Sequence, residues 1–263
     1  MFGYLRLFLT VALLAGIGAG VVNWGLHMVG TSPLILDAEV YEKAGEDAAP
    51  ATTETAAAEA EAATVVAPEA STTETGGAEA TGHEHHHDAE AWEPADGWQR
   101  NLFTLGADVV TGVGYAFLLT AAIVFFGKGA DWRRGIIWGL AGFTCFSLAQ
   151  SFGLPPELPG TEAAPLLERQ VWWIGTAIAT AAGLFAAVRM RNVLGFVIAA
   201  VLIALPHVIG APQPATPGGL APEELEHKFI VEAIATSLVF WLVLGVLTGA
   251  FFKRSANEEG VTA

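Results

Sequence analysis

Six consecutive residues, His83-Glu84-His85-His86-His87-Asp88, bring together four imidazoles and two carboxylates. Imidazole suits zinc, copper, iron, nickel and cobalt, whereas a purely carboxylate site favours calcium or magnesium. The run therefore predicts a site for a divalent transition metal, with His83, Glu84, His85, His86, His87 and Asp88 as its ligands. The competing interpretation is a solvated polar tract that binds metal only incidentally, and composition alone does not separate the two.

The same run formally satisfies the zinc-protease pattern H-E-x-x-H, with Glu84 in the position of the general base. That chemistry needs both histidines on one face of a packed helix. Gly76, Gly77 and Gly82 precede the run, and no apolar face supports a helix there. We therefore predict that the chain is not an enzyme. It also has no glycine-rich phosphate loop, and we predict no organic cofactor.

The rest of the chain is too hydrophobic for an ordinary soluble domain. Of its 263 residues, 53% are hydrophobic and 15% are charged, whereas soluble domains carry nearer a quarter of charged residues. The formal net charge is −15, and most acidic residues fall in one loop. This balance argues against nucleic acid as a partner and favours a cation. The single Cys145 cannot form an internal disulfide.

Six apolar stretches have about the length, roughly 20 residues, that crosses a bilayer. They are residues 5–29, 101–126, 134–152, 171–188, 192–209 and 229–252, of which the fifth is the shortest. A single arginine before the first stretch, without a clear cleavage site after it, favours a retained helix over a signal peptide. Gly16 and Gly20 form a small-xxx-small pattern that predicts close helix packing. The expected fold is an all-α, polytopic membrane helix bundle that spans the lipid bilayer.

Four segments follow from this pattern: a first helix (1–30), a long acidic loop (31–100), a five-helix membrane region (101–252) and a tail (253–263). Residues 33–42 of the loop are expected to be ordered, with a helix as one option. Residues 44–91 are mostly Ala, Thr, Glu and Gly, too poor in large apolar groups to fold alone. We expect this part, which includes the histidine cluster at 83–88, to be disordered.

Basic residues predict the orientation, because cytoplasmic loops are enriched in Lys and Arg. With six helices and the amino terminus inside, eight of the 12 basic residues are cytoplasmic, and only Lys43, Arg100, Arg169 and Lys228 lie outside. Both termini are then cytoplasmic, and the histidine-rich loop lies on the outer face of a bacterial inner membrane. The expected aromatic belt has Trp132 at the inner interface and, at the outer one, Trp24, Trp98, Trp172 and Trp173.

Ionisable residues inside membrane spans are costly, so each is a candidate site. The candidates are His27, Asp108, His207 and Glu232. Outer segments add Asp37, Glu39, Glu157, Glu162, Glu223, Glu224, Glu226 and His227. Together these groups could line an acidic vestibule that concentrates cations before permeation. The alternative is that each acts alone, with His27 and Glu232, about one turn from a helix end, simply reaching water.

Seven stretches, in order, resemble the CbtA-type cobalt transporter subunit. They are PLILDAEVYE (33–42), EPADG and RNLFT (93–97 and 100–104), WGLAGF (138–143), GLPPELPG (153–160), RQVWW with GTA (169–173 and 175–177), ALPHVIGAP (204–212) and SLVFW (237–241). The resemblance covers residues 1–43 and 92–252. The family is usually described with five spans, whereas the residues here indicate six.

The resemblance implies uptake of Co²⁺ as substrate in cobalamin-producing bacteria, together with a small, single-helix, histidine-rich partner subunit of the CbtB type. It also moves the expected metal site to Glu157 and His207, which fall in matching stretches at the outer ends of neighbouring helices. By ligand type, Ni²⁺ or Zn²⁺ would fit equally well. A non-transporting membrane metal sensor or an assembly subunit is the alternative function.

Overall fold

The computed structural model describes residues 2–48, 94–126 and 130–258, and every regular element in these ranges is helical except one isolated β-bridge. The predicted all-α class is therefore confirmed for the described chain. The histidine run at 83–88 and most of the loop predicted to be disordered lie outside the described residues.

Helices occupy all six predicted apolar stretches. They are α1 (Phe2–Val29), α3 (Trp98–Phe126), α4 (Trp132–Phe143) continued by the π-helical turn η1 (Thr144–Leu148) and α5 (Ala149–Ser151), α6 (Leu166–Met190), α7 (Val193–Ile209) and α8 (Glu223–Glu258). Among the described residues, four helices, α1, α3, α6 and α8, are long and apolar enough to cross a membrane. Helix α7 is a shorter apolar helix of 17 residues, about 25 Å long. The prediction of six spans is thus supported in part.

Helix α2 (Thr31–Ala48) confirms that residues 33–42 are ordered, and it extends further than expected. Helix α2 thus continues past residue 44, near which the disordered part of the loop is expected to begin. Leu34 and Ala38 of α2 are buried against Phe229 of α8. Packing on another helix supplies apolar contacts that the local composition lacks, and these contacts stabilise the first half of α2.

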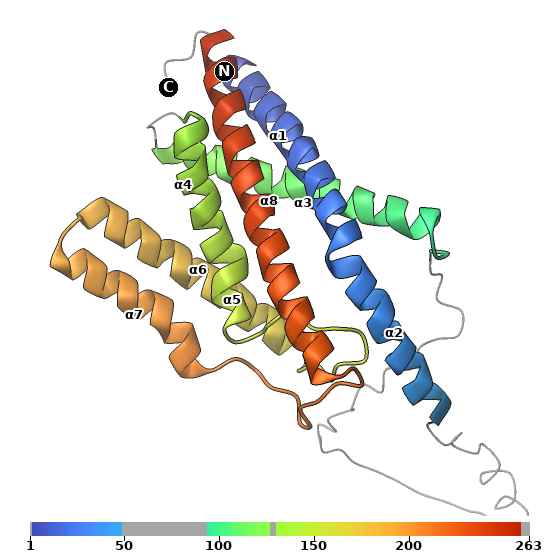
Figure 1. Ribbon diagram of the computed structural model, residues 1–263. Coiled ribbons are helices and arrows are strands. Elements are labelled where there is room, and N and C mark those ends of the chain that lie inside the picture. The colour runs from blue at the N-terminus through green and yellow to red at the C-terminus, as the bar shows by residue number, and fades with distance from the viewer. Residues whose placement is uncertain (1, 49–93, 127–129, 259–263) are drawn as a thin grey trace, which may run out of the picture.

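The helices form a bundle with two distinct ends (Figure 1). Helices α1 and α8 lie side by side and run in opposite directions, and α4 packs on α8. Helices α6 and α7 form an antiparallel pair beside α4 and α5. We call the end that holds the start of α1 and the end of α8 the terminal end. The opposite end, with α2 and the connections 152–165 and 210–222, is the loop end.

Glycines allow close contact at two helix pairs. A Cβ atom at Gly20 of α1 would lie only 2.6 Å from the Cα of Val109 and 2.7 Å from the carbonyl oxygen of Asp108, both on α3. Similarly, a Cβ at Gly245 of α8 would lie 2.8 Å from the Cα of Gly139 on α4. The close packing predicted from Gly16 and Gly20 is therefore confirmed, and it fixes the register of α1 against α3.

At the terminal end, Asp131 caps the amino terminus of α4. Its carboxylate accepts hydrogen bonds from the backbone N–H groups of Arg134 (2.9 Å) and Arg133 (3.0 Å). These bonds, that of Arg134 foremost, hold the pKa of Asp131 below its ordinary value. The Arg133 guanidinium lies 5.2 Å from the ring centroid of the exposed Trp132, an arrangement suited to the headgroup region of a membrane.

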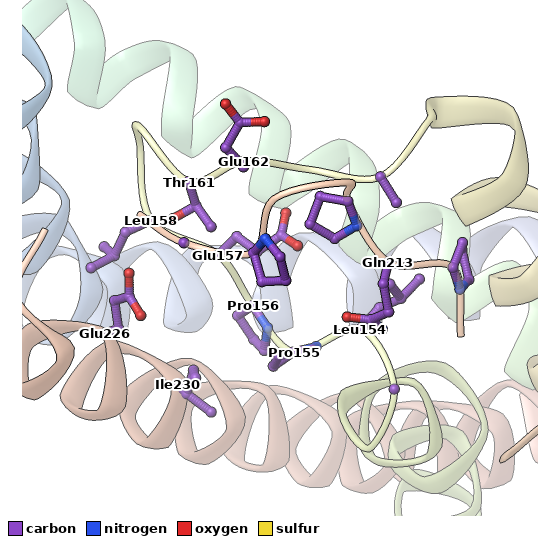
Figure 2. A pocket seen from close by; sticks show the side chains of 16 residues that line it. Leu154, Pro155, Pro156, Glu157, Leu158, Thr161, Glu162, Gln213, Glu226 and Ile230 are labelled. Atoms are coloured by element: carbon purple, nitrogen blue, oxygen red, sulfur yellow. The ribbon is translucent and has the colours of Figure 1, made fainter. Parts of the chain in front are cut away.

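At the loop end, the connections 152–165 and 210–222 are joined to each other. The N–H of Glu162 donates to the carbonyl of Gly218 (3.0 Å), and the N–H of Leu220 donates to that of Gly160 (3.3 Å). Figure 2 shows the hollow of about 180 Å³ between these connections and α8, with Glu226 projecting from the helix. Backbone pairing therefore gives this irregular region a fixed shape.

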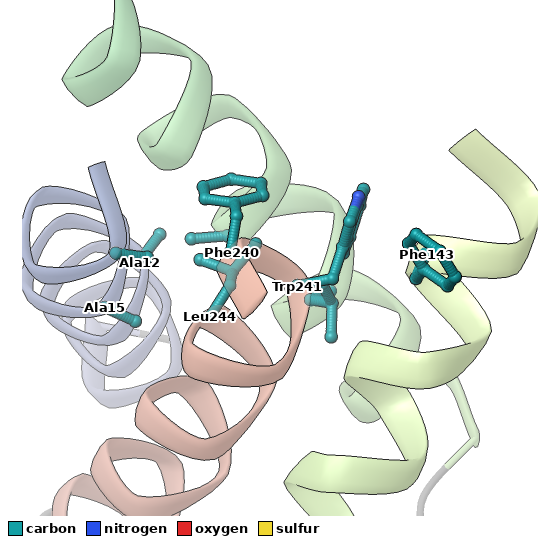
Figure 3. Close-up of a cluster of buried hydrophobic side chains, with 9 residues drawn as sticks. Ala12, Ala15, Phe143, Phe240, Trp241 and Leu244 are labelled. Carbon is teal, nitrogen blue, oxygen red and sulfur yellow. The ribbon is translucent and has the colours of Figure 1, made fainter. Parts of the chain in front are cut away.

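The main hydrophobic core lies where α1, α3, α4 and α8 meet (Figure 3). Its largest fully buried side chain is Trp241 of α8, which packs with Phe143, Phe240 and Leu244. Small residues of α1, such as Ala12 and Ala15, complete the cluster. Along α1 the core lies closer to the terminal end than the polar groups described next, and it holds together the helices that carry them.

Candidate functional site

A polar cluster inside the bundle joins α1 to α3. Nδ1 of His27 lies 3.2 Å from Oδ2 of Asp108, and Nδ2 of Asn23 donates a 2.8 Å hydrogen bond to Oδ1 of the same carboxylate. The Asp108 side chain is only 10% exposed, whereas that of His27 is 30% exposed. Two of the four ionisable residues predicted inside the spans therefore lie in direct contact.

A cavity of about 720 Å³ opens beside this cluster, between α1, α2, α3, η1 and α8. The polar side chains that line it include Asn23, His27, Thr104, Thr111, Tyr115 and Ser237. Asp96 and Arg100 line the side nearest the start of α3. The cavity thus offers oxygen and nitrogen donors in the half of the bundle towards the loop end, as a passage for a cation requires.

Arg100 is the basic residue of this cavity, and carboxylates of two segments hold it. Its Nη1 lies 3.2 Å from Oε2 of Glu39 on α2 and 3.2 Å from Oδ1 of Asp96, and its Nη2 also binds Glu39. Glu39, predicted to face the vestibule, is therefore engaged in an ion pair. The pair ties α2 to α3.

Other predicted vestibule residues lie at the edge of the site. Glu232 of α8 lies near the joint between α1 and α2. Its Oε2 would be 3.4 Å from a Cβ atom added at Gly30. Asp37 lines a separate surface hollow with Lys228, and His227 is exposed on α8. Within the described chain, no hydrogen bond or ion pair joins Glu232, Asp37 or His227 to the His27–Asp108 pair.

Glu157 and His207, the pair expected from the matching stretches, occupy different surroundings. Oε2 of Glu157 accepts a 2.7 Å hydrogen bond from Arg169. The His207 ring lies edge-on to Phe152 and Trp172, with centroid distances of 6.1 and 5.8 Å. In the described part of the molecule, no contact joins Glu157 to His207, so their role as a joint metal site remains a prediction.

A second cavity of about 850 Å³ lies on the other side of η1, between α5, α6 and α8. Ser147, Ala233 and Ser237 line both cavities. Ser147 accepts hydrogen bonds from the hydroxyl of Ser237 (2.7 Å) and from the indole N–H of Trp241 (3.1 Å). A π-helical turn, which often occurs at functional sites, therefore contributes a hydroxyl to the partition between two cavities.

Sequence reasoning missed Asn23 and Ser147. Asn23 could have been found, because it precedes His27 by four residues and so lies on the same helical face. Ser147 gave no such signal, since its position depends on the π-helical turn, which the amino-acid pattern of α4 to α5 does not reveal.

The cluster offers two metal-ligating side chain types, an imidazole and a carboxylate, on adjacent helices. In the ranges 2–48, 94–126 and 130–258, no group of three or more His, Cys, Asp or Glu side chains is placed to hold a metal ion. A metal in the cavity would therefore complete its coordination with water, neutral oxygen atoms or groups from elsewhere. Such partial coordination suits passage better than storage.

The chain matches a protein-family model described as "Probable cobalt transporter subunit (CbtA)" over residues 5–253. The match covers nearly the whole chain, and that description names a transporter subunit. No curated protein and no solved structure matched the chain.

Proposed function

The chain belongs to the CbtA family of probable cobalt transporter subunits, and we propose that it is the subunit through which a divalent transition metal, Co²⁺ first of all, enters the cell. The observation that carries this proposal beyond the family description is the cavity of about 720 Å³ with His27 in its wall. By ligand type, Ni²⁺ and Zn²⁺ are alternative substrates.

The proposed topology has six crossings, with both termini on the cytoplasmic side of a bacterial inner membrane. Three observations support it. The start of α1 and the end of α8 share one end of the bundle (Figure 1). Arg133, Arg134, Lys253 and Arg254 all lie at that terminal end, as the positive-inside rule requires. The continuous helical stretch 132–151 and the short α7 supply the fifth and sixth crossings.

The proposed route starts on the outer face of the membrane, where His83, His85, His86 and His87 with Glu84 and Asp88 capture metal from the outer solution. Acidic residues there, among them Glu162 and Glu226 in the hollow of Figure 2, raise the local cation concentration. Metal then enters the His27 cavity and passes to the second cavity beside Ser147 and Ser237. Both serines line both cavities, which supports passage between the two.

A partner subunit belongs to the proposal. The family description calls the protein a subunit, and a small, single-helix, histidine-rich partner of the CbtB type would supply further ligands. The second cavity is lined by Leu166, Trp173 and Ile174 of α6. Its apolar part faces the surface that a further membrane helix could cover.

The test is uptake of radioactive cobalt by cells that express the chain with and without its partner. Wild type is compared with a variant whose residues 49–91 are replaced by a glycine-serine linker of equal length. This boundary leaves α2 intact, because that helix ends at Ala48. Capture by the loop predicts a higher half-saturating cobalt concentration with a nearly unchanged maximal rate.

A matched control changes only His83, His85, His86 and His87 to serine and keeps the rest of the loop. It should reproduce the linker result if the imidazoles act as the antenna. Absence of uptake by wild type, with the partner present and the protein in the membrane, would contradict the transport proposal. A non-transporting metal sensor or assembly subunit would then be the better interpretation.

A further inference from the structure

We propose that His27 binds the transported metal through Nε2 and that Asp108 is the positioning residue behind it. This inference rests on the proposed function for the identity of the metal. It is independent of the histidine cluster at 83–88 and of the expected pair Glu157 and His207.

The first argument is the division of the two ring nitrogens between protein and cavity. Nδ1 of His27 faces Asp108 at 3.2 Å, and in an imidazole ring Nε2 then points away from that carboxylate. His27 lines the cavity, whereas Asp108 is buried behind it and is not among the lining residues. Nε2 is therefore the nitrogen that an ion in the cavity can reach.

The second argument is the state of the buried carboxylate. Asn23 donates to Oδ1 of Asp108. Oδ2 is buried, and among the described residues it has no hydrogen bond of good geometry, although Nδ1 of His27 is in ion-pair range. A carboxylate in a membrane bundle needs a positive partner. A divalent cation bound to His27 is such a partner.

The third argument is the chemistry of metal-binding histidines. Such a histidine almost always donates its second ring N–H to a carboxylate, a carbonyl or water, which fixes the tautomer and makes the other nitrogen a better ligand. Asp108 lies beside Nδ1 of His27, which is the position that such a carboxylate partner occupies. Asn23 and the close contact of Gly20 with α3 hold Asp108 in turn.

The fourth argument separates His27 from the other histidine of the membrane helices. His207 lies edge-on to two aromatic rings, and among the described residues no carboxylate contact with it is recorded. His27 alone of the two combines a carboxylate partner with a cavity wall. A single imidazole also gives the weak, exchangeable binding that transport requires.

The experiment measures Co²⁺ binding by its visible ligand-field absorption. The protein is the purified full chain in which His83, His85, His86 and His87 are serine, so that the loop contributes no imidazole. We expect His27→Gln to remove the imidazole-dependent band. We expect Asp108→Asn to weaken binding by about 10- to 100-fold with the band position unchanged, because the metal keeps the same nitrogen ligand. Glu168→Gln, an exposed carboxylate on α6, is the charge-matched control and should bind like the parent.

Two results would overturn the proposal. One is loss of the band in His207→Gln while His27→Gln keeps it. The other is an Asp108→Asn variant that binds as tightly as the parent.

Size-exclusion profiles and thermal unfolding identify variants that do not fold. For that case the unsubstituted protein provides a second measurement, in which Co²⁺ should slow carbethoxylation of His27 by diethylpyrocarbonate more than that of the exposed His227. Equal rates for His27 with and without cobalt would contradict the proposal.

Cobalt uptake measured in parallel distinguishes failure of this inference from failure of the proposed function. Uptake by His27→Gln equal to wild type would reject His27 as the binding residue and leave transport intact. Binding at His27 without any wild-type uptake would reject transport and leave the site, which would then serve metal sensing or assembly.

Discussion

The side of the bundle built by α1, α3 and α8 differs from the side built by α6 and α7 in what its ionisable groups contact. On the first side, His27 has a buried carboxylate behind it and a cavity in front of it. On the second side, Arg169 neutralises Glu157, and His207 lies between aromatic rings. The pairs compared, His27 with Asp108 and His207 with Glu157, each consist of one histidine and one carboxylate that were candidates for metal binding.

The comparison teaches that residue type alone does not make a metal site in a membrane bundle. A ligand must have a donor atom that the protein does not already use, and this atom must face a space that an ion can enter. Glu157 uses its oxygen for a structural ion pair at the loop end. His27 has Nδ1 beside Asp108 and lines a cavity, and in the proposed site Nε2 is the atom left for a metal.

The largest effect is expected from a change in the helix contact that builds the first side. Gly112→Leu on α3 would force a side chain into the backbone of α1 at Gly16, and such overpacking costs about 1–3 kcal/mol or more. We expect loss of folded protein and of most cobalt uptake, measured by membrane expression and by thermal unfolding in detergent. The matched control is Gly175→Leu on α6, because a Cβ there meets no atom within 4 Å. Equal damage from both variants would contradict the contrast between the two sides.

An intermediate effect is expected from pH. Protons compete with metal for imidazole nitrogen, so uptake should decrease as the pH falls below about 6. The decrease should persist when His83, His85, His86 and His87 are serine, because His27 still offers an imidazole nitrogen to the metal. Uptake measured from pH 7.5 to 5 checks this. A flat profile in the serine variant would mean that uptake depends on the imidazoles of the loop and not on His27.

The smallest effect is expected on the second side. Glu157→Gln removes an ion pair whose side chains are 26% and 30% exposed, and pairs of this kind contribute about 0–1 kcal/mol. Cobalt uptake should stay within about twofold of wild type, and the thermal midpoint should decrease only slightly. A loss of uptake as large as that of His27→Gln would restore Glu157, and with it the pair with His207, as the metal site.

Much of the fold could be predicted because helices within a membrane depend on local composition. Each of the six apolar stretches is helical, and Gly16 and Gly20 indicated the close contact that the structure contains. The end of α2 could not be predicted, because its last residues, 44–48, are small or acidic and show no apolar pattern, and its buried contacts with α8 lie in its first half. The site was predicted in part, since His27 and Asp108 were candidates, but the reasoning treated them singly.

The sequence by itself determined the membrane class, the order of the helices and, through the matching stretches, the family. Each of these follows from hydrophobicity and residue order, which do not depend on how the helices rotate against one another. Only the tertiary structure decided which polar groups meet. Asn23 and Asp108 are 85 positions apart, and they touch because glycine packing sets the rotation and register of α1 against α3. The same packing leaves His27 at the wall of a cavity, whereas His207 lies among aromatic rings.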